Sequence, residues 1–238
     1  MRGLTSPGAS LSERDLTERA ILPATLAALD DFVEDLVTLS TETRSGAPTG
    51  LIVGVAALTA GHVSALWARQ VPRIVAAVLP HVPTEMHGWY TTRLTSRLLD
   101  SDFPGHAFTV TRQIVDDAAA AAEVRRQWLS EVREALGAGK PDSPWEAASH
   151  RIARTEATAA HNLSIISSIV GEGFTQKRWV TRRDNRVRPS HAAADGQTVP
   201  LDQDFLVGGY SLAYPAHLDA GASGSVTINC RCVLVGVP

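Results

Sequence analysis

Three residues in the C-terminal part of the chain are of the types that bind metal ions. Cys230 and Cys232 are separated by one residue, so an extended segment places both side chains on the same face. His191 could add a nitrogen ligand, with Asp195 or His217 as a fourth ligand of a tetrahedral zinc site. Two interpretations stay open: a zinc ion that stabilises a domain with a small core, or two reduced thiols that pack as small apolar side chains.

His191 and Asp195 are also spaced as an acid/base pair would be on one helical face, which is a spacing used in metal-assisted hydrolysis. The alternative is that His191 caps or bridges a turn, while Asp195 and Gly196 supply turn chemistry. The run Arg154, Thr155, Glu156 is interpreted as a structural hydrogen-bonding cluster. The sequence holds no nucleophile with a base partner, no P-loop and no dinucleotide-binding glycine motif, so we expect no enzymatic activity.

A basic run lies between residues 177 and 188, where six residues are basic and one, Asp184, is acidic. Exposed arginines in this run could contact DNA phosphates or a protein partner, in which case DNA binding would be independent of base sequence and sensitive to salt. Alternatively, the arginines pair with Asp184 or Asp195 inside a small domain. The candidate contact residues are Lys177, Arg178, Arg182, Arg183, Arg186 and Arg188.

The elements that must position these residues follow from the spacing of apolar side chains. Residues 145–170 show the periodicity of a helix with one apolar face, and Asn162 falls on that face, so its amide must bond to the backbone of a neighbouring element. Residues 177–181 read as a strand buried through Trp179, and residues 186–188 as its returning partner after a tight turn.

The remaining C-terminal segments are short. Ser190 is expected to cap a single helical turn that ends at Gly196 in a left-handed conformation, followed by an extended segment to residue 200. Residues 225–237 predict a β-branched strand, a tight corner at the cysteines and a final strand.

The first half of the chain predicts helices without a chemical motif. We expect a helix from Ser12 to Leu22, interrupted by Pro23 and followed by a second amphipathic helix. Residues 51–68 predict a buried or oligomer-facing helix rather than a membrane span, because glycine, hydroxyl side chains and one histidine lower their hydropathy. Further helices are predicted over residues 84–99 and 109–136.

Composition limits the function classes. The chain has 238 residues, with 22 basic and 25 acidic side chains and a net charge of −3, so it lacks the overall positive charge of a general nucleic-acid binder. Both cysteines lie in the last nine residues, which excludes a scaffold held by many disulfides, and we expect no signal peptide.

The two parts of the chain differ in charge: residues 1–149 carry a charge of −5 and residues 150–238 a charge of +2. A glycine- and proline-containing stretch at 137–144 predicts the boundary between a helical region, 1–143, and a second module, 144–238.

The ordered residues of the second module resemble a known family. Glu156 and Asn162 on a helix precede a K-R-W-x-x-x-x-D-x-R-V-R-x-S-H-x-x-x-D-G pattern and a terminal N-C-R-C, and together they are similar to the phage Mu F-like minor head proteins over residues 150–234. The structural positions of the pattern are Glu156, Asn162, Trp179, Asp184, Asp195 and Gly196.

The resemblance implies a minor capsid or head morphogenesis protein of a tailed bacteriophage, located in the virion head near the portal vertex after synthesis in the host cytoplasm. It implies several copies around a portal protein, contact with major capsid or scaffolding protein and with packaged double-stranded DNA, and a role in procapsid assembly, DNA packaging or DNA delivery. We expect an α+β fold, with mostly helical N-terminal residues followed by one long helix against a short antiparallel sheet. No cofactor is required, although zinc at His191, Cys230 and Cys232 stays open. The alternatives from other classes are a metal-dependent hydrolase and a DNA-binding module that does not read base sequence.

Overall fold

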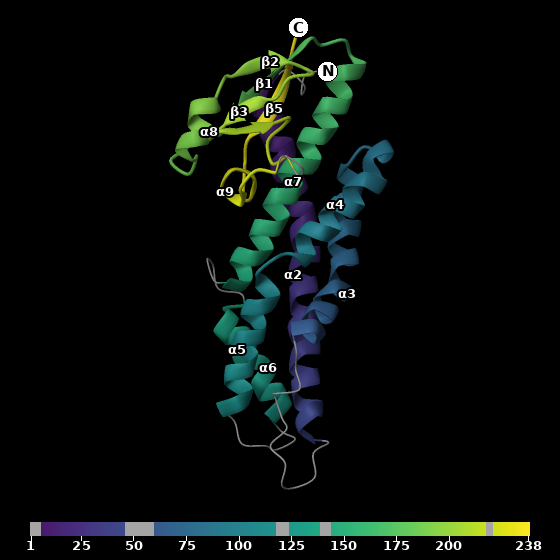
Figure 1. The fold of residues 1–238 in the computed structure, drawn as a ribbon, viewed down its shortest axis with the longest axis vertical. Helices are drawn as coiled ribbons and strands as arrows, with labels where there is room; N and C mark the ends of the chain where they lie inside the picture. The colour runs from purple at the N-terminus through teal and green to yellow at the C-terminus, as the bar shows by residue number, and fades with distance from the viewer. Residues whose placement is uncertain (1–5, 46–59, 118–123, 139–143, 218–220) are drawn as a thin grey trace. The chain divides into compact units, whose positions relative to one another are not determined.

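The computed structural model describes residues 6–45, 60–117, 124–138, 144–217 and 221–238 (Figure 1). Its helices are α2 (Pro7–Ser45), α3 (Ala60–Val78), α4 (His87–Leu99), α5 (Phe103–Asp117), α6 (Val124–Leu136), α7 (Pro144–Gly171), α8 (Pro189–Ala194) and α9 (Gly224–Thr227), with single 3-10 turns at Leu79–His81 and Thr84–Met86. Its strands are β1 (Gln176–Val180), β2 (Thr198–Pro200), β3 (Phe205–Val207), β4 (Tyr210–Leu212) and β5 (Val233–Val237). The expected α+β class is confirmed.

Contacts divide the chain into two compact units that do not follow chain order. The first unit comprises residues 1–23, 75–94 and 151–238, and the second comprises residues 24–74 and 95–150. The first unit therefore collects two segments from the N-terminal half around the C-terminal sheet. The boundary that the sequence suggests at residues 143 and 144 stays a prediction.

The second unit is helical and has an aromatic centre. The rings of Phe32, Trp67 and Phe103 lie within 5.5 to 6.1 Å of one another, centroid to centroid. The Trp67 indole N–H donates to the Leu98 carbonyl at 2.7 Å, so this buried polar group is satisfied. The described part of the predicted helix at 51–68 is the start of α3, where Val63, Leu66 and Trp67 are buried as expected; residues 51–59 lie outside the described residues.

The first unit contains a three-stranded antiparallel sheet in the order β2-β1-β5 and a separate β3-β4 hairpin. Trp179 on β1 lies opposite Leu234 on β5, and both are fully buried. Figure 1 shows this sheet beside the C-terminal part of α7. Gly236 on β5 lies so close to α7 that an added Cβ would stand 2.9 Å from Ile169 Cγ2, and small size at this position lets the strand approach the helix. The predicted arrangement of one long helix against a short antiparallel sheet is confirmed.

The start of α2 completes this core. Leu11 packs against the buried cluster of Val180, Val233 and Val235. Ser10 Oγ lies 2.7 Å from His161 Nε2 on α7, and both side chains are buried. Residues near the N-terminus therefore cover the sheet and the helix of the C-terminal segment.

Two helix predictions in the first half are wrong. Pro23 does not interrupt α2, which runs through it: the proline ring is exposed, and burial of Ile21 and Thr25 on either side holds the helix although one backbone hydrogen bond is lost. The single helix predicted over 109–136 is two helices, α5 and α6, which contact each other and so cannot form one straight element. Residues 118–123 between them lie outside the described residues.

Three predictions of local structure near the site are also wrong. Residues 186–188 do not pair with β1, because the Arg186 N–H donates to Asp184 Oδ1 at 3.0 Å and curls the chain, while β2 and β5 take both edges of β1. Ser190 is not a cap, since α8 begins with Pro189 at its first turn and Arg188 at its N-cap without a side-chain bond. The segment expected as a strand from 225 is the helical turn α9, because Ser223 Oγ accepts from the Ser225 N–H and caps it.

Candidate functional site

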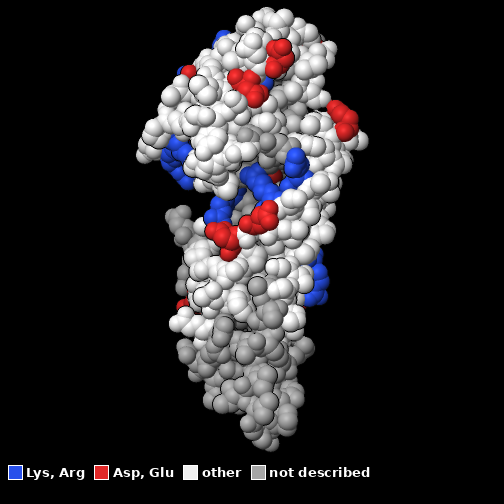
Figure 2. All heavy atoms as spheres, in the orientation of Figure 1, with Lys and Arg blue, Asp and Glu red and all other residues white. Residues whose placement is uncertain are grey.

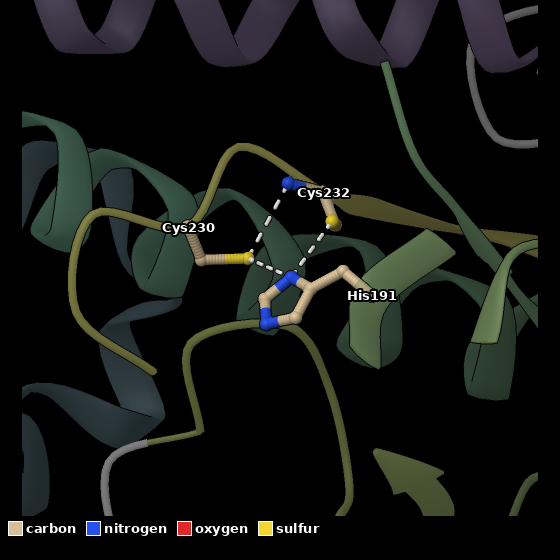
Figure 3. A group of neighbouring side chains, drawn as sticks. All are labelled: His191, Cys230 and Cys232. Atoms are coloured by element: carbon tan, nitrogen blue, oxygen red, sulfur yellow. Dashed lines mark hydrogen bonds between the residues drawn. The ribbon is translucent and has the colours of Figure 1, made fainter. Parts of the chain in front are cut away.

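The side chains of His191, Cys230 and Cys232 meet inside the first unit. His191 lies on α8, and the cysteines lie in the segment that leads into β5. His191 Nδ1 lies 3.3 Å from Cys232 Sγ and 3.7 Å from Cys230 Sγ, and Figure 3 shows this nitrogen turned toward both sulfurs. All three residues are buried and both cysteines are free thiols. The three residues that the sequence proposes as ligands are therefore adjacent; their role stays a prediction.

A polar row on α7 holds the cysteine segment in place. Thr158 Oγ1 donates to the Cys230 carbonyl at 2.6 Å, and Thr155 Oγ1 accepts from the Asn229 N–H at 2.7 Å. Asn162 donates to the Cys232 carbonyl at 3.3 Å and accepts from the Leu234 N–H at 2.8 Å. The prediction that the buried Asn162 amide bonds to a neighbouring backbone is confirmed.

Thr158 in this row was not predicted from the sequence. Its signal was present, because residues 155, 158 and 162 follow the helical spacing of three and four and bring polar groups to one side of the helix.

The two thiols influence each other's protonation. Burial raises the pKa of Cys230, but hydrogen bonds from Cys232 and His191 outweigh it, so the pKa of Cys230 lies well below its usual value. The hydrogen bond with Cys230 and burial together raise the pKa of Cys232 well above its usual value. The metal-free pair therefore holds one thiolate more readily than two.

Trp179 packs against the cluster from β1. Its ring stands edge-on to His191, with centroids 5.7 Å apart, and edge-on to Phe205 at 5.4 Å. His191 Nε2 is buried and has no hydrogen-bond partner among the described residues, so the polar contacts of the ring are those to the two sulfurs. The imidazole is thus fixed by packing in an orientation that directs Nδ1 at the cysteines.

Neither residue proposed as a fourth ligand joins the cluster. Asp195 accepts from the Thr181 N–H and from Arg183, each at 2.8 Å, and closes the turn after β1. His217 Nδ1 accepts from the Ala213 N–H at 3.2 Å. Gly196 has φ +81, which confirms the left-handed position expected at the end of α8. Asp195 and Gly196 therefore serve the turn, as the structural alternative expected, and His191 does not cap it.

A pocket of about 140 Å³ opens beside the cysteines, and half of its lining residues are arginines. His191, Cys230 and Cys232 form part of its wall. Its other lining residues are Arg154, Arg182, Arg186, Val187, Arg188, Asn229 and Arg231. Figure 2 shows basic side chains gathered beside acidic ones on the face in view.

Acidic side chains neutralise only some of these arginines. Arg154 pairs with Glu18 at 3.2 Å, Arg231 pairs with Asp184 at 2.7 Å, and Arg182 pairs with Asp15. Arg188 donates to the Ile228 carbonyl at 2.6 Å. The exposed guanidinium of Arg186 makes no hydrogen bond or ion pair with any described residue.

The electrostatics of Arg154 reflect this excess of positive charge. Burial lowers the pKa of Arg154, and three neighbouring guanidiniums lower it further against the opposing effect of Glu18. Those guanidiniums belong to Arg14, Arg186 and Arg231. The pocket is therefore suited to an anion, and above all to an oxyanion that accepts several N–H bonds.

The basic run splits between the pocket and other places. Arg182, Arg186 and Arg188 line the pocket, whereas Arg178 bonds to Thr198 and Arg183 bonds to Asp195. Lys177 has to be removed from the contact candidates: it is 2% exposed, and its ammonium donates to the Ala213 carbonyl at 2.8 Å. The alternation of a strand explains this, because Lys177 and Trp179 share the inward face of β1.

Two arginines of the pocket were not predicted from the sequence. Arg231 lies between the two cysteines, and Arg154 lies on α7, far from the basic run in the sequence. Arg154 also donates to Asn229 at 2.7 Å, and Glu156 accepts from the Tyr90 hydroxyl at 3.1 Å. The structural role expected of the run 154–156 stays a prediction.

A known protein family matches the part of the chain that holds the cysteine cluster and the arginine pocket. Residues 112–235 match the family described as phage Mu protein F like protein, which is more than half of the chain. The chain belongs to this family. The match includes every residue of the cysteine cluster and of the arginine pocket, and it begins well before residue 150, where the resemblance in the sequence begins. The family takes its description from protein F of phage Mu.

One relative has a different name. A segment of 96 residues, 37% of this chain, is 28% identical to the NAD(+)--arginine ADP-ribosyltransferase EFV of Enterococcus faecalis and covers 18% of that protein. The activity in that name belongs to the relative, most of which has no counterpart in the match. No solved structure was found to match the chain. Among the described residues, no helix combines the length and the apolar character that crossing a membrane requires.

Proposed function

We propose that this protein is a minor capsid protein that acts at the portal vertex during head assembly. The observation that carries the proposal is the family match over residues 112–235, since the matched residues include the polar row on α7, the cysteine segment and the arginine pocket. The described geometry agrees with a structural role: Thr155, Thr158 and Asn162 make bonds that hold the chain in one conformation. In this proposal the helical N-terminal region contacts the portal or the inner capsid, several copies surround the portal, and no catalysis is required.

The decisive experiment is quantitative mass spectrometry of purified particles, before and after triggered DNA release, with a pull-down on the portal protein. Presence at a few copies per particle, together with capture by the portal, supports the proposal. Loss on DNA release adds a role in delivery. Absence from both particles and portal complexes would overturn the virion assignment.

We also propose that the arginine pocket contacts the phosphate groups of packaged DNA. The support is the set of five arginines around one pocket on a chain of net charge −3, and the guanidinium of Arg186, which has no partner among the described residues. Such contacts would not read base sequence, because phosphates are the same at every step.

Two variants test the contact. Arg186→Ala removes a pocket guanidinium, and Arg178→Ala removes an exposed arginine of the same run that lies on β1 outside the pocket. We expect Arg186→Ala to weaken binding to double-stranded DNA and to lower the slope of log affinity against log salt by about 0.9, the value for one phosphate contact. Arg178→Ala should keep the slope of the unaltered protein. Equal losses in the two variants, or no DNA binding at low salt, would reject the pocket as the contact.

A further inference from the structure

The ligand atoms of His191, Cys230 and Cys232 lie about as far apart as the ligands of a metal ion do. The three ligand atoms, Nδ1 and two Sγ, lie within 4.8 Å of one another. A tetrahedral zinc ion with Zn–S of about 2.3 Å and Zn–N of about 2.0 Å places nitrogen and sulfur about 3.5 Å apart. The observed separations of 3.3 and 3.7 Å from Nδ1 lie on either side of that value. The two nitrogen–sulfur separations therefore need shifts of only tenths of an ångström to match a zinc site.

Charge favours a metal at this place. Two buried thiolates would repel each other and lose hydration, but Zn²⁺ with two thiolates and a neutral imidazole has no net charge. The structure already fixes each ligand: Thr158 holds the Cys230 carbonyl, Asn162 holds the Cys232 carbonyl, and the ring of His191 packs on Trp179. Because these contacts already hold the ligand side chains in place, little conformational entropy is lost when a metal ion binds.

The pocket is where a fourth ligand could enter. The same three residues form part of the pocket wall, and the cluster holds no further histidine, cysteine or carboxylate among the residues that the structure describes. The arginines around the pocket would attract an anion to that position. We propose that His191 Nδ1 and the thiolates of Cys230 and Cys232 bind one zinc ion, whose fourth ligand is a water molecule or an anion from the arginine-lined pocket.

The first test is the metal content of the full-length protein, purified under reducing conditions from zinc-supplied cells and measured by mass spectrometry. We expect about one zinc per chain, because the site offers three preformed ligands. Cys230→Ser and Cys232→Ser keep the side-chain size and should lose most of the zinc. His106→Gln, which changes an exposed histidine of the second unit, should keep it. The proposal is overturned if the unaltered protein binds much less than one zinc per chain. It is also overturned if a variant that carries both Cys230→Ser and Cys232→Ser keeps its full zinc content.

A second measurement needs no variant and so does not depend on how a variant folds. The unaltered protein, loaded with Co²⁺ in place of zinc, should show ultraviolet charge-transfer absorption from cobalt–thiolate bonds and the intense visible bands of tetrahedral cobalt. Addition of inorganic phosphate should shift the visible bands if the fourth position is open to the pocket. Absence of the thiolate bands contradicts the ligand set, and visible bands that phosphate leaves unchanged contradict the open position.

Discussion

Asn162 joins α7 to two other backbone segments, at Pro215 and at residues 232–234, through a single amide. Its Nδ2 lies 2.8 Å from the Thr158 carbonyl and 3.3 Å from the carbonyls of Pro215 and Cys232, and its Oδ1 accepts from the Leu234 N–H at 2.8 Å. The side chain is fully buried, so water cannot replace these bonds when the amide is lost.

We therefore expect Asn162→Ala to lower the free energy of unfolding by about 3 kcal/mol, since it leaves several buried backbone groups without partners. Urea denaturation followed by circular dichroism measures the change. Ser168→Ala on the exposed side of the same helix is the control and should change stability by less than about 0.5 kcal/mol. Equal effects of the two substitutions would show that the amide bonds contribute little.

His161 makes the stability of the protein depend on pH. Burial and the nearby Arg14 lower the pKa of His161 from 6.5 to about 4. Between pH 6.5 and about pH 4, His161 is protonated in the unfolded chain but stays neutral in the folded chain. The free energy of unfolding therefore falls as the pH falls through this window.

Between pH 7 and pH 5 the contribution of His161 amounts to a loss of about 2 kcal/mol. His161→Gln keeps an acceptor near Ser10 Oγ but does not titrate. We expect urea denaturation of this variant to show a smaller loss of stability between pH 7 and pH 5 than that of the unaltered protein. If both proteins lose the same amount, groups other than His161 cause the acid sensitivity.

At the scale of elements, the contact between β5 and α7 depends on the absence of a side chain at Gly236. A Cβ there would stand 2.9 Å from Ile169 Cγ2 and 3.0 Å from the Phe174 ring. Gly236→Val should cost about 2 kcal/mol, because the strand and the helix must separate to admit the side chain. Gly88→Ala in α4 is the control: a Cβ there meets nothing within 4 Å, and removal of glycine from a helix should leave stability unchanged or raise it. Thermal unfolding of both variants measures the difference, and an unchanged melting temperature for Gly236→Val would mean that the contact is loose.

The elements that the sequence predicts correctly are those whose signal is local. The apolar stripe of α7, the left-handed Gly196 and the final strand β5 depend on residues within one element or turn. The partners of β1 could not be predicted in this way, because β2 and β5 reach it from different distances along the chain and local spacing contains no information on pairing. At α9, the Ser223 cap outweighs the β-branched residues that suggested a strand.

In the candidate site, too, the features predicted correctly were those visible in a short stretch of sequence, and those missed depend on contacts between distant segments. The identities of His191, Cys230 and Cys232 suggested a cluster, and the fold brings them together. The membership of Arg154 and Arg231 in the pocket depends on how α7 meets the cysteine segment, which no short motif encodes. The burial of Lys177 likewise depends on which face of β1 the rest of the fold covers, because Lys177 shares that inward face with Trp179.

At the scale of the whole molecule, the first compact unit needs residues that precede the C-terminal module. Arg182 and Arg154 pair with Asp15 and Glu18 from the start of α2, and Leu11 packs against the sheet. Residues 75–94 belong to the same unit, where the Ser164 hydroxyl donates to the His81 carbonyl at 3.1 Å.

A fragment of residues 144–238 should therefore fail to fold cooperatively, although the sequence boundary would make it an independent domain. Without the N-terminal segments, the fragment exposes apolar surface around Val180 and Val233, and it leaves Arg154 and Arg182 without their carboxylates. Amide-resolved nuclear magnetic resonance and urea denaturation of the fragment, compared with the full chain, provide the measurement. Adding a peptide of residues 1–23 in trans should restore part of the structure if this segment supplies the missing contacts. A fragment with dispersed resonances and a sharp unfolding transition would instead establish residues 144–238 as a domain, and would assign the contacts of the α2 start to docking rather than to folding.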